Sequence, residues 1–387
     1  MKAQRFYLSQ GVSVREHEDE FYIETLKNEY KINRTIATFI GLLDAPKTAP
    51  ELTTGLQALI TGASAAVVEP LVAKFLKDLH RLDVVRREGE ADLVPRAALY
   101  EPGAQLGQYL ITELLSLHDD VQVYRATDGE TGQPVVLKLF SHKPESIRPD
   151  THLDDDFEQF QQEFDIMRAL PAHPGICLLH AYHTEPYHYA VLEYLPGASL
   201  SEAARNVNIC EATATELATQ ILSALAHLHG HGIVHGDIHA RNFVVDADRV
   251  TMIDFGYAYR VGISEREQLI CRGGVPTYMA PERIKQHNYK FSKQAADFRA
   301  EVYQIALVIF KLYHKELPFA GETWLERAAS IATYDFSLHF SPSVPHEQVL
   351  LHALQKDPQA RYASGQELLA AWQQALAVEM PALAVTP

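Results

Sequence analysis

Two polar motifs, separated by one short apolar run, constrain this chain more than any other feature of its sequence. The first motif runs from His235 to Asn242 (His-Gly-Asp-Ile-His-Ala-Arg-Asn) and places Asp237 five residues before its final Asn. The apolar run ends at Val245 and has the composition of a strand, and the second motif, Asp254-Phe-Gly, follows it. An isolated Asp commonly caps a loop, but two motifs in this order make that interpretation weak.

Two further motifs lie downstream. They are Gly274-Val-Pro-Thr-Tyr-Met-Ala-Pro-Glu282 and Asp357-Pro-Gln-Ala-Arg361. In this order the four motifs resemble the catalytic core of the protein-kinase family, including its GTPxYxAPE and DPxxR segments, and the resemblance covers about residues 107–377. It implies a buried ion pair between Glu282 and Arg361.

The resemblance also implies an α+β fold of the bilobal protein-kinase type. The small lobe is expected at about residues 107–195 and the large lobe at about residues 196–377. A segment at 88–103 contains Gly and Pro residues that interrupt any periodic pattern, which predicts a domain boundary. We therefore expect an N-terminal domain at residues 1–96 and a kinase-like catalytic domain at residues 97–387.

Phosphoryl transfer requires a protein to hold a triphosphate, neutralise it with Mg²⁺ and direct a hydroxyl at the γ-phosphorus. The resemblance implies that Asp237 orients the substrate hydroxyl and accepts its proton as the general base. It also implies that Asn242 and Asp254 supply the oxygen ligands that Mg²⁺ prefers. ATP and Mg²⁺ are therefore the expected cofactors.

A lysine interrupts the apolar, strand-like run from Pro134 to Phe140. Because burying an amine is costly without an anionic partner, Lys138 is expected to contact the ATP phosphates. Its protein partner is expected to be Glu163, on a helix whose apolar face is marked by regularly spaced phenylalanines. Glu158 on the same helix is the alternative partner.

The segment from Tyr189 to Gly197 (Tyr-Ala-Val-Leu-Glu-Tyr-Leu-Pro-Gly) is an apolar strand that enters a turn. By resemblance this segment is the hinge that binds adenine. Leu192 is then the gatekeeper, and backbone groups of Glu193 and Leu195 meet the base. Such a role depends little on side-chain identity.

The phosphate-covering loop departs most from the family pattern. The family has Gly-x-Gly-x-x-Gly-x-Val, whereas this chain has Ser116-Leu-His-Asp-Asp-Val-Gln-Val123, in which Val123 is the expected cofactor contact. Glycine lets backbone N–H groups approach phosphates closely, and Asp119 and Asp120 repel phosphates unless they point away. Altered ATP binding is therefore expected, with His118 as a solvent-facing residue at the hairpin tip.

Other departures are milder. Gly236 stands where many kinases have the Arg that a phosphorylated activation loop recruits, so activation by loop phosphorylation is not required. Glu301 replaces a structural Asp, and its longer carboxylate can still cap the catalytic loop. His239 replaces the Lys usual in Ser/Thr kinases, and Val275 replaces the usual Thr, which leaves the acceptor open between Ser/Thr, the favoured class, and Tyr.

The N-terminal domain has its own pattern. Three short β-prone segments precede three amphipathic helices, and Thr48-Ala-Pro-Glu51 has the pattern of a capping box. With a closing hairpin at 84–94, this order predicts a winged-helix-like module. It resembles the PqqD-like peptide-recognition domains of enzymes that modify ribosomal peptides, in which a leader peptide adds a strand to a free sheet edge. A winged helix for dimerisation or regulation is the alternative.

Charge and cysteine content narrow the class of protein. The formal net charge is −16, which argues against nucleic acid as a partner. The three cysteines, Cys177, Cys210 and Cys271, form no CxxC pair and indicate a reducing compartment. We find no apolar stretch of signal-peptide or membrane-spanning length, so a cytoplasmic protein with no membrane partner is expected.

We therefore expect a Mg·ATP-dependent kinase that transfers the γ-phosphate to a hydroxyl of a peptide or protein. The N-terminal domain would hold that substrate, for which a ribosomally made peptide precursor is the candidate. One alternative is a pseudokinase scaffold, whose degenerate glycine loop marks lost catalysis. Another is a small-molecule kinase, against which the Ala-Pro-Glu and DPxxR segments argue.

Overall fold

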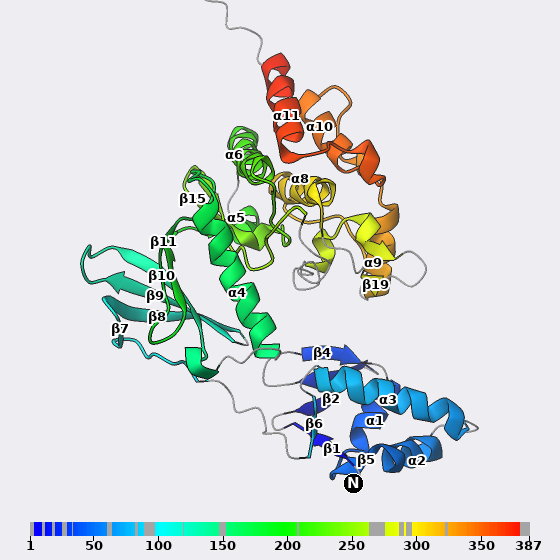
Figure 1. The fold of residues 1–387 in the computed structure, drawn as a ribbon. Helices are drawn as coiled ribbons and strands as arrows, with labels where there is room; N and C mark the ends of the chain where they lie inside the picture. Colours follow the sequence, from blue (N-terminus) through cyan, green and yellow to red (C-terminus); the bar gives the residue numbers. More distant parts are fainter. Residues whose placement is uncertain are drawn as a thin grey trace, which may run out of the picture. The chain divides into compact units, whose positions relative to one another are not determined.

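The computed structural model describes most of the chain, which divides into two compact units, Met1–Ala97 and Ala98–Pro387 (Figure 1). The residues described are 4–9, 12–17, 20–24, 29–32, 34–59, 64–81, 84–88, 97–118, 120–146, 152–206, 209–262, 275–285, 290–291, 296–321 and 324–379. Outside them lie Asp119, Cys271, Gly274 and the second strand of the hairpin predicted at 84–94, as does the side chain of His118.

The first unit contains two small antiparallel sheets. In one sheet β3 lies between β2 and β4, and in the other β1 lies between β5 and β6. The three segments predicted to be β-prone fall in the first three strands. The strands are β1 (Arg5–Leu8), β2 (Ser13–His17), β3 (Glu20–Glu24), β4 (Glu29–Ile32), β5 (Lys47–Thr48) and β6 (Val85–Arg87).

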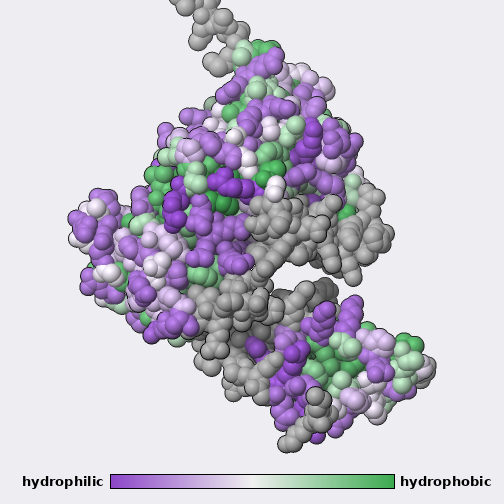
Figure 2. Space-filling view, in the orientation of Figure 1, coloured by the Kyte–Doolittle hydropathy of each residue, from purple (hydrophilic) through white to green (hydrophobic). Residues whose placement is uncertain are grey.

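Three helices complete the first unit: α1 (Arg34–Gly41), α2 (Ala49–Leu59) and α3 (Ala65–Arg81). The capping box before α2 is confirmed, because the Thr48 N–H donates to the Glu51 carboxylate over 2.7 Å and the Glu51 N–H donates to Thr48 Oγ1 over 3.4 Å. The three helices share one apolar core, in which the rings of Phe39 and Phe75 lie 5.2 Å apart. Figure 2 shows hydrophobic residues over α3 on the visible face of this unit.

The second unit opens with a six-stranded antiparallel sheet in the order β11-β12-β10-β9-β8-β7. Helix α4 (His152–Ala169) packs against this small lobe, where the rings of Phe160 and Phe140 lie 5.3 Å apart. The visible outer face of the lobe is mainly hydrophilic (Figure 2). The strands are β7 (Gln105–Leu106), β8 (Tyr109–His118), β9 (Val121–Asp128), β10 (Pro134–Phe140), β11 (Leu179–His183) and β12 (Tyr189–Glu193).

The large lobe is built around α6 and α8, and α8 is buried from Ala300 to Leu312. Its helices are α5 (Leu200–Asn206), α6 (Glu211–Gly230), α8 (Phe298–His314), α9 (Trp324–Thr333), α10 (Pro345–Ala353) and α11 (Gly365–Glu379). Its strands are β13 (Ala198–Ser199), β14 (Ile233–Val234), β15 (Phe243–Asp246), β16 (Arg249–Met252), β17 (Tyr259–Arg260), β18 (Ile284–Lys285) and β19 (Lys290–Phe291). None of the helices in the described ranges has an apolar stretch that could cross a bilayer.

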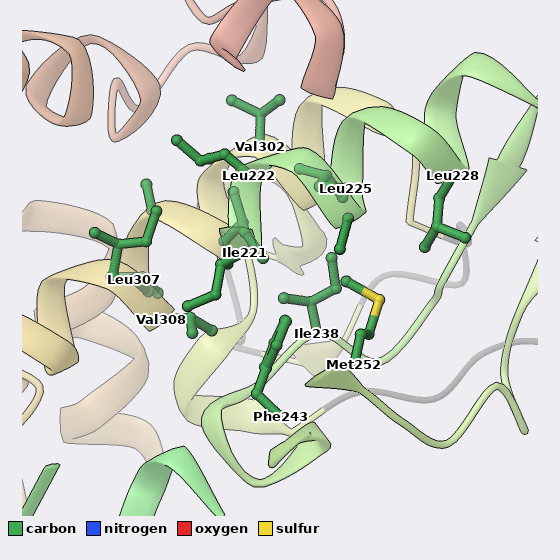
Figure 3. Close-up of a cluster of buried hydrophobic side chains, with 14 of the residues drawn as sticks. Ile221, Leu222, Leu225, Leu228, Ile238, Phe243, Met252, Val302, Leu307 and Val308 are labelled. Carbon is green, nitrogen blue, oxygen red and sulfur yellow. The ribbon is translucent and has the colours of Figure 1, made fainter. Parts of the chain in front are cut away.

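Buried side chains fix the position of the catalytic loop in this lobe (Figure 3). Ile238 of the loop and Phe243 and Met252 of the strands that follow it pack against Leu225 of α6 and Val308 of α8. All five are at most 1% exposed, so removing any one of them would open a cavity beneath the loop. The second unit therefore has the two-lobed α+β architecture predicted for it, with the loop anchored on the helical core.

Candidate active site

Lys138 of β10 contacts two acidic residues from different elements. Its Nζ lies 2.8 Å from each carboxylate oxygen of Glu163 on α4 and 2.9 Å from Oδ1 of Asp254 after β16. The other acidic residue considered, Glu158, is exposed. The lysine thus joins the small-lobe sheet, α4 and the large lobe at one point.

Burial and charge act in opposite directions on the pKa values of this cluster. Burial lowers the pKa of Lys138, but the charges of Asp254 and Glu163 outweigh it and hold the pKa above its ordinary value of 10.5. The Lys138 charge lowers the pKa of Asp254 to about 2, against the effect of burial. Burial, with the Asp254 charge, raises the pKa of Glu163. Lys138 is therefore charged and Asp254 ionised at neutral pH.

A cavity of about 810 Å³ lies beside this cluster, lined by residues of both lobes. Part of its wall is apolar and comes from the strands β9, β10, β12 and β15, through Val123, Val136, Leu192 and Val244. Of the residues predicted from the sequence, the cavity brings together Lys138, Glu163, Asp254, Val123, Glu193, Leu195 and the gatekeeper Leu192. Asp237 and Asn242 are not among its lining residues.

The side chain of Glu193 is held by the protein. One of its carboxylate oxygens lies 3.1 Å from Nη1 of Arg249 in β16, and the other accepts from the Leu178 N–H over 3.3 Å. The Glu193 N–H in turn donates to the Leu178 carbonyl over 2.9 Å. What Glu193 can offer to a ligand in the cavity is therefore its backbone carbonyl.

Asp237 of the catalytic loop is held by two contacts. Its Oδ1 accepts a hydrogen bond from the Val275 N–H over 3.1 Å, and its Oδ2 lies at an ion-pair distance of 3.3 Å from His239 Nε2. His239 Nδ1 accepts from the Arg241 N–H over 3.2 Å, which assigns the proton of the neutral ring to Nε2, facing Asp237. Both residues that depart from the family pattern, Val275 and His239, thus contact this carboxylate.

Asn242 and Asp254 fit a divalent cation by the chemistry of their donors. Asn242 Nδ2 donates to the Asp237 carbonyl over 3.0 Å, which leaves the amide oxygen as its ligand atom. Asp254 has φ of +62°, in the left-handed region that non-glycine residues rarely adopt, and its ionised side chain is half exposed. Carboxylate and amide oxygens are the hard ligands that Mg²⁺ prefers.

Two departures from the family pattern meet beneath the catalytic loop. The Glu301 carboxylate accepts from the backbone N–H groups of His235 and Gly236, so the predicted cap is confirmed. Gly236 has φ of +83°, and a Cβ there would lie 2.2 Å from the Tyr257 carbonyl oxygen. Only glycine fits this backbone, because any side chain would clash with that carbonyl.

The predicted ion pair at the base of the large lobe is also confirmed. The Arg361 guanidinium donates to both carboxylate oxygens of Glu282 over 2.8 and 2.7 Å. Arg361 is fully buried, and a bidentate pair of this kind fixes the segment before α8 to the segment before α11.

The turn between β8 and β9 holds Asp120, one of its two acidic residues, by contacts with the segment that follows β10. Asp120 Oδ1 lies 2.6 Å from Nε2 of His142, just beyond β10, and the Asp120 carbonyl accepts from the Ser141 N–H over 2.7 Å. Asp120 lines the cavity, and its carboxylate is in contact with the His142 ring. A phosphate in the cavity would therefore meet a carboxylate that already has a contact within the protein.

Sequence reasoning missed two glutamines of α4. Gln159 Nε2 donates to the Gly256 carbonyl over 2.7 Å, and Gln162 Nε2 donates to the Ala258 carbonyl over 3.0 Å. Their spacing from Glu163, four residues and one residue before it, puts all three on one side of the helix. This spacing was the one sign in the sequence that the two glutamines share the side of the helix that carries the buried Glu163.

Comparison with known proteins agrees with this geometry. The protein kinase domain family matches residues 120–373. The probable serine/threonine-protein kinase PknB of Lactococcus lactis is 29% identical over 275 residues, which cover 68% of this chain and 41% of that protein. Serine/threonine-protein kinase PrkC of Bacillus subtilis is 28% identical over 274 residues, covering 68% and 39%. CBL-interacting protein kinase 28 of Oryza sativa is 26% identical over 277 residues, covering 70% and 60%.

The chain thus spans about two fifths to three fifths of the length of these relatives. The family match begins at Asp120, after the positions where family members have their first two loop glycines. Membership implies ATP and a divalent metal ion, which suit the donors described above. The chain belongs to the protein kinase family.

Proposed function

We propose that this enzyme transfers the γ-phosphate of Mg·ATP to a Ser or Thr hydroxyl of a peptide or protein held by its N-terminal unit. The observation that carries the catalytic part is the contact of Lys138 Nζ with both Glu163 and Asp254. Such a contact requires the small lobe, α4 and the loop after β16 to be aligned around one point, as phosphoryl transfer demands.

In this proposal adenine occupies the apolar part of the cavity, against Val123 and Leu192. The Glu193 carbonyl accepts from the exocyclic amine of adenine, since the Glu193 N–H is already bonded to Leu178, and a backbone group of Leu195 meets the ring. Lys138 binds the phosphates. Its Glu163 partner holds the amine in place when the phosphates replace part of its contact with Asp254.

The proposed roles in the catalytic loop follow from donors and charge. Asp254 and the amide oxygen of Asn242 hold Mg²⁺, which neutralises the phosphates when bound. Asp237 accepts the proton of the substrate hydroxyl. The Val275 N–H and His239 Nε2–H hold its carboxylate in one orientation.

Transfer of label from γ-labelled Mg·ATP tests the catalytic proposal. The acceptors are the protein itself, a degenerate Ser/Thr/Tyr peptide library and hydroxylated small molecules, and the variants are Asp237→Asn and Asp254→Asn. We expect label on Ser or Thr with the wild type alone. Nucleotide binding without transfer to any acceptor would identify a pseudokinase, and label on small molecules alone would identify a small-molecule kinase.

The substrate-binding role rests on the two edges of the β2-β3-β4 sheet in the first unit. Among the described strands, β2 and β4 each pair with β3 alone, so their outer edges can accept another strand. We propose that this unit is a winged-helix-like, PqqD-like module that binds a leader peptide by strand addition, and that the substrate is a ribosomally made peptide precursor.

Deletion of residues 1–96 tests this role, with basal ATP hydrolysis as the measure that the kinase unit is intact. We expect the KM for a leader-bearing peptide to rise at least tenfold while ATP hydrolysis and phosphorylation of short peptides persist. An unchanged KM for the leader-bearing peptide would reject delivery by the N-terminal unit and favour its use in dimerisation or regulation.

A further inference from the structure

Helix α4 is bonded along one side to the backbone that follows Asp254. Gln159 donates to the Gly256 carbonyl and Gln162 donates to the Ala258 carbonyl, and Glu163, beside Gln162, binds Lys138. Two side chains of the helix thus bond two residues that lie within three positions of the segment. Figure 1 shows α4 running beside the part of the large lobe that contributes this segment.

The two glutamine contacts differ from the ion pair they flank. They use a neutral donor and a backbone acceptor, so they form whatever residues follow Asp254 and need no added charge. Both glutamines are partly buried, where a hydrogen bond is worth more than in open water. They also lie within one turn of Glu163, so their loss would act first on the position of that carboxylate.

The catalytic loop has no arginine directly before Asp237 that could bind a phosphorylated loop and so help to align α4. The residue before Asp237 is Gly236, whose φ of +83° and close approach to the Tyr257 carbonyl exclude a cationic side chain. A phosphate on the loop that follows residue 262 would find no arginine at this position. The contacts that Gln159 and Gln162 make in the unmodified chain provide an alignment of α4 that does not depend on such an arginine.

We propose that Gln159 and Gln162 are positioning residues that hold α4 against residues 256–258, so that the Lys138–Glu163 pair forms in the unphosphorylated enzyme. The inference rests on the proposed kinase function and adds the means by which its active alignment is maintained. Neither glutamine touches the reacting atoms. Each acts through the placement of Glu163, and through it of Lys138.

Substitution by glutamate tests the proposal, because a glutamate side chain has nearly the same size and shape as glutamine. A carboxylate cannot donate to a carbonyl, so Gln159→Glu and Gln162→Glu replace each bond with a repulsive contact between two acceptors. Gln161→Glu is the matched control, because it makes the same change on the same helix at a partly buried glutamine that neighbours Gln162 in the sequence. Circular dichroism and thermal unfolding of the full chain report whether each variant folds.

We expect the double variant Gln159→Glu/Gln162→Glu to lower kcat by about tenfold or more, which corresponds to a rise of about 1.4 kcal/mol in the activation barrier. The KM for ATP should change by less than about threefold, because the apolar wall that meets adenine is untouched. Gln161→Glu should leave kcat within about twofold of the wild type.

The pH profile separates positioning from general damage to the fold. The introduced carboxyl groups ordinarily titrate at about pH 4.3, and partial burial raises this pKa. Once protonated, their O–H can again donate to the carbonyls, so the ratio of variant to wild-type kcat should rise as the pH falls from about 8 toward that pKa. A folding defect would not recover on acidification. Treatment of the wild type with a protein phosphatase should leave kcat unchanged.

The possible failures are distinct. If the wild type transfers no phosphate, the proposed function fails. If the wild type is active and the double variant keeps the same kcat as the wild type and as Gln161→Glu, the glutamines do not position α4. The proposal is also overturned if phosphatase treatment abolishes wild-type activity, because alignment would then depend on a phosphate.

Discussion

Oε1 of Glu301 accepts a 2.7 Å hydrogen bond from the backbone N–H of Gly236. The other oxygen accepts from the His235 N–H over 3.1 Å and lies 3.0 Å from His229 Nε2. Since His229 Nδ1 accepts from the Gly365 N–H over 2.8 Å, its Nε2 carries the proton and donates to the carboxylate. One fully buried acid on α8 therefore holds the start of the catalytic loop in place.

Glu301→Ala should destabilise the protein and reduce catalysis together. It leaves three buried donors without an acceptor, so we expect the free energy of unfolding to fall by about 3 kcal/mol or more. Denaturant unfolding of the full chain measures this, and kcat should fall because Asp237 loses its support. Glu316→Ala is the control. It removes an exposed acid that pairs with Arg205 and should cost less than about 1 kcal/mol, and an equal effect of the two changes would contradict the role given to Glu301.

Gly236→Ala should be more damaging than Gly232→Ala, although both glycines have positive φ. A Cβ at 236 would meet the Tyr257 carbonyl, whereas nothing lies within 4 Å of a Cβ at 232. We expect a loss of about 1 kcal/mol at 232 from backbone strain, and at least about 2 kcal/mol more at 236 from the clash. Thermal unfolding of both variants checks the difference. Similar values would mean that the loop relaxes around the new methyl group.

Lys138→Met should alter the pH dependence of metal binding as well as catalysis. The lysine lowers the pKa of Asp254 to about 2, so without it the carboxyl should titrate at or above its ordinary value of 3.8. Because a lowered pKa preserves the ionised form during acidification, Mn²⁺ affinity should fall earlier in the variant, between about pH 5 and about pH 3, where the wild-type carboxyl is still mostly ionised. Mn²⁺ titrations at several pH values measure this, and parallel curves would show that Lys138 does not control the charge of Asp254.

Phosphate transfer should fall by at least about a hundredfold in the same Lys138→Met variant, since one preorganised donor to a developing charge is worth that much. Transfer assays with γ-labelled ATP measure the loss. The expected fall is in kcat rather than in adenine binding, because the apolar wall of the cavity is unchanged.

His142→Ala should raise the KM for ATP by roughly threefold or more. It removes the ring that contacts the Asp120 carboxylate, and Asp120 lines the cavity proposed to receive the phosphates. Replacing Asp120 by Asn in the same chain should restore the KM, because the residual charge is then gone. Steady-state kinetics with varied ATP gives the KM of the single and the double variant. If the double variant has the same raised KM as His142→Ala alone, the contact acts on the shape of the turn instead of on its charge.

The parts of the site that could be predicted are those in which a charged group needs one kind of partner. A lysine in an apolar strand requires an acid, and the structure supplies Glu163 and Asp254. The capping box before α2 and the Glu282–Arg361 pair follow the same logic, because the sequence names both members of each pair.

The parts that could not be predicted depend on backbone partners or on strand register. Gln159 and Gln162 bond carbonyl groups, which every residue has, so no pattern of side chains points to Gly256 or Ala258. Asp120 reaches His142 only because β9 and β10 pair so that Val121 lies opposite Phe140. In the first unit, β1 pairs with strands more than forty residues away, which local periodicity does not encode.

The attachment of Glu193 to Arg249 also bears on how the two lobes can move. Arg249 bonds the Pro174 carbonyl as well, and the neighbouring Met252 exchanges backbone hydrogen bonds with Gly175 and Cys177. The small-lobe segment between α4 and β11 and the end of β12, where the chain passes to the large lobe, are therefore both fastened to β16. Rotation of the small lobe about this attachment would therefore have to break the contact between Lys138 and Asp254, which joins the two lobes at a second place.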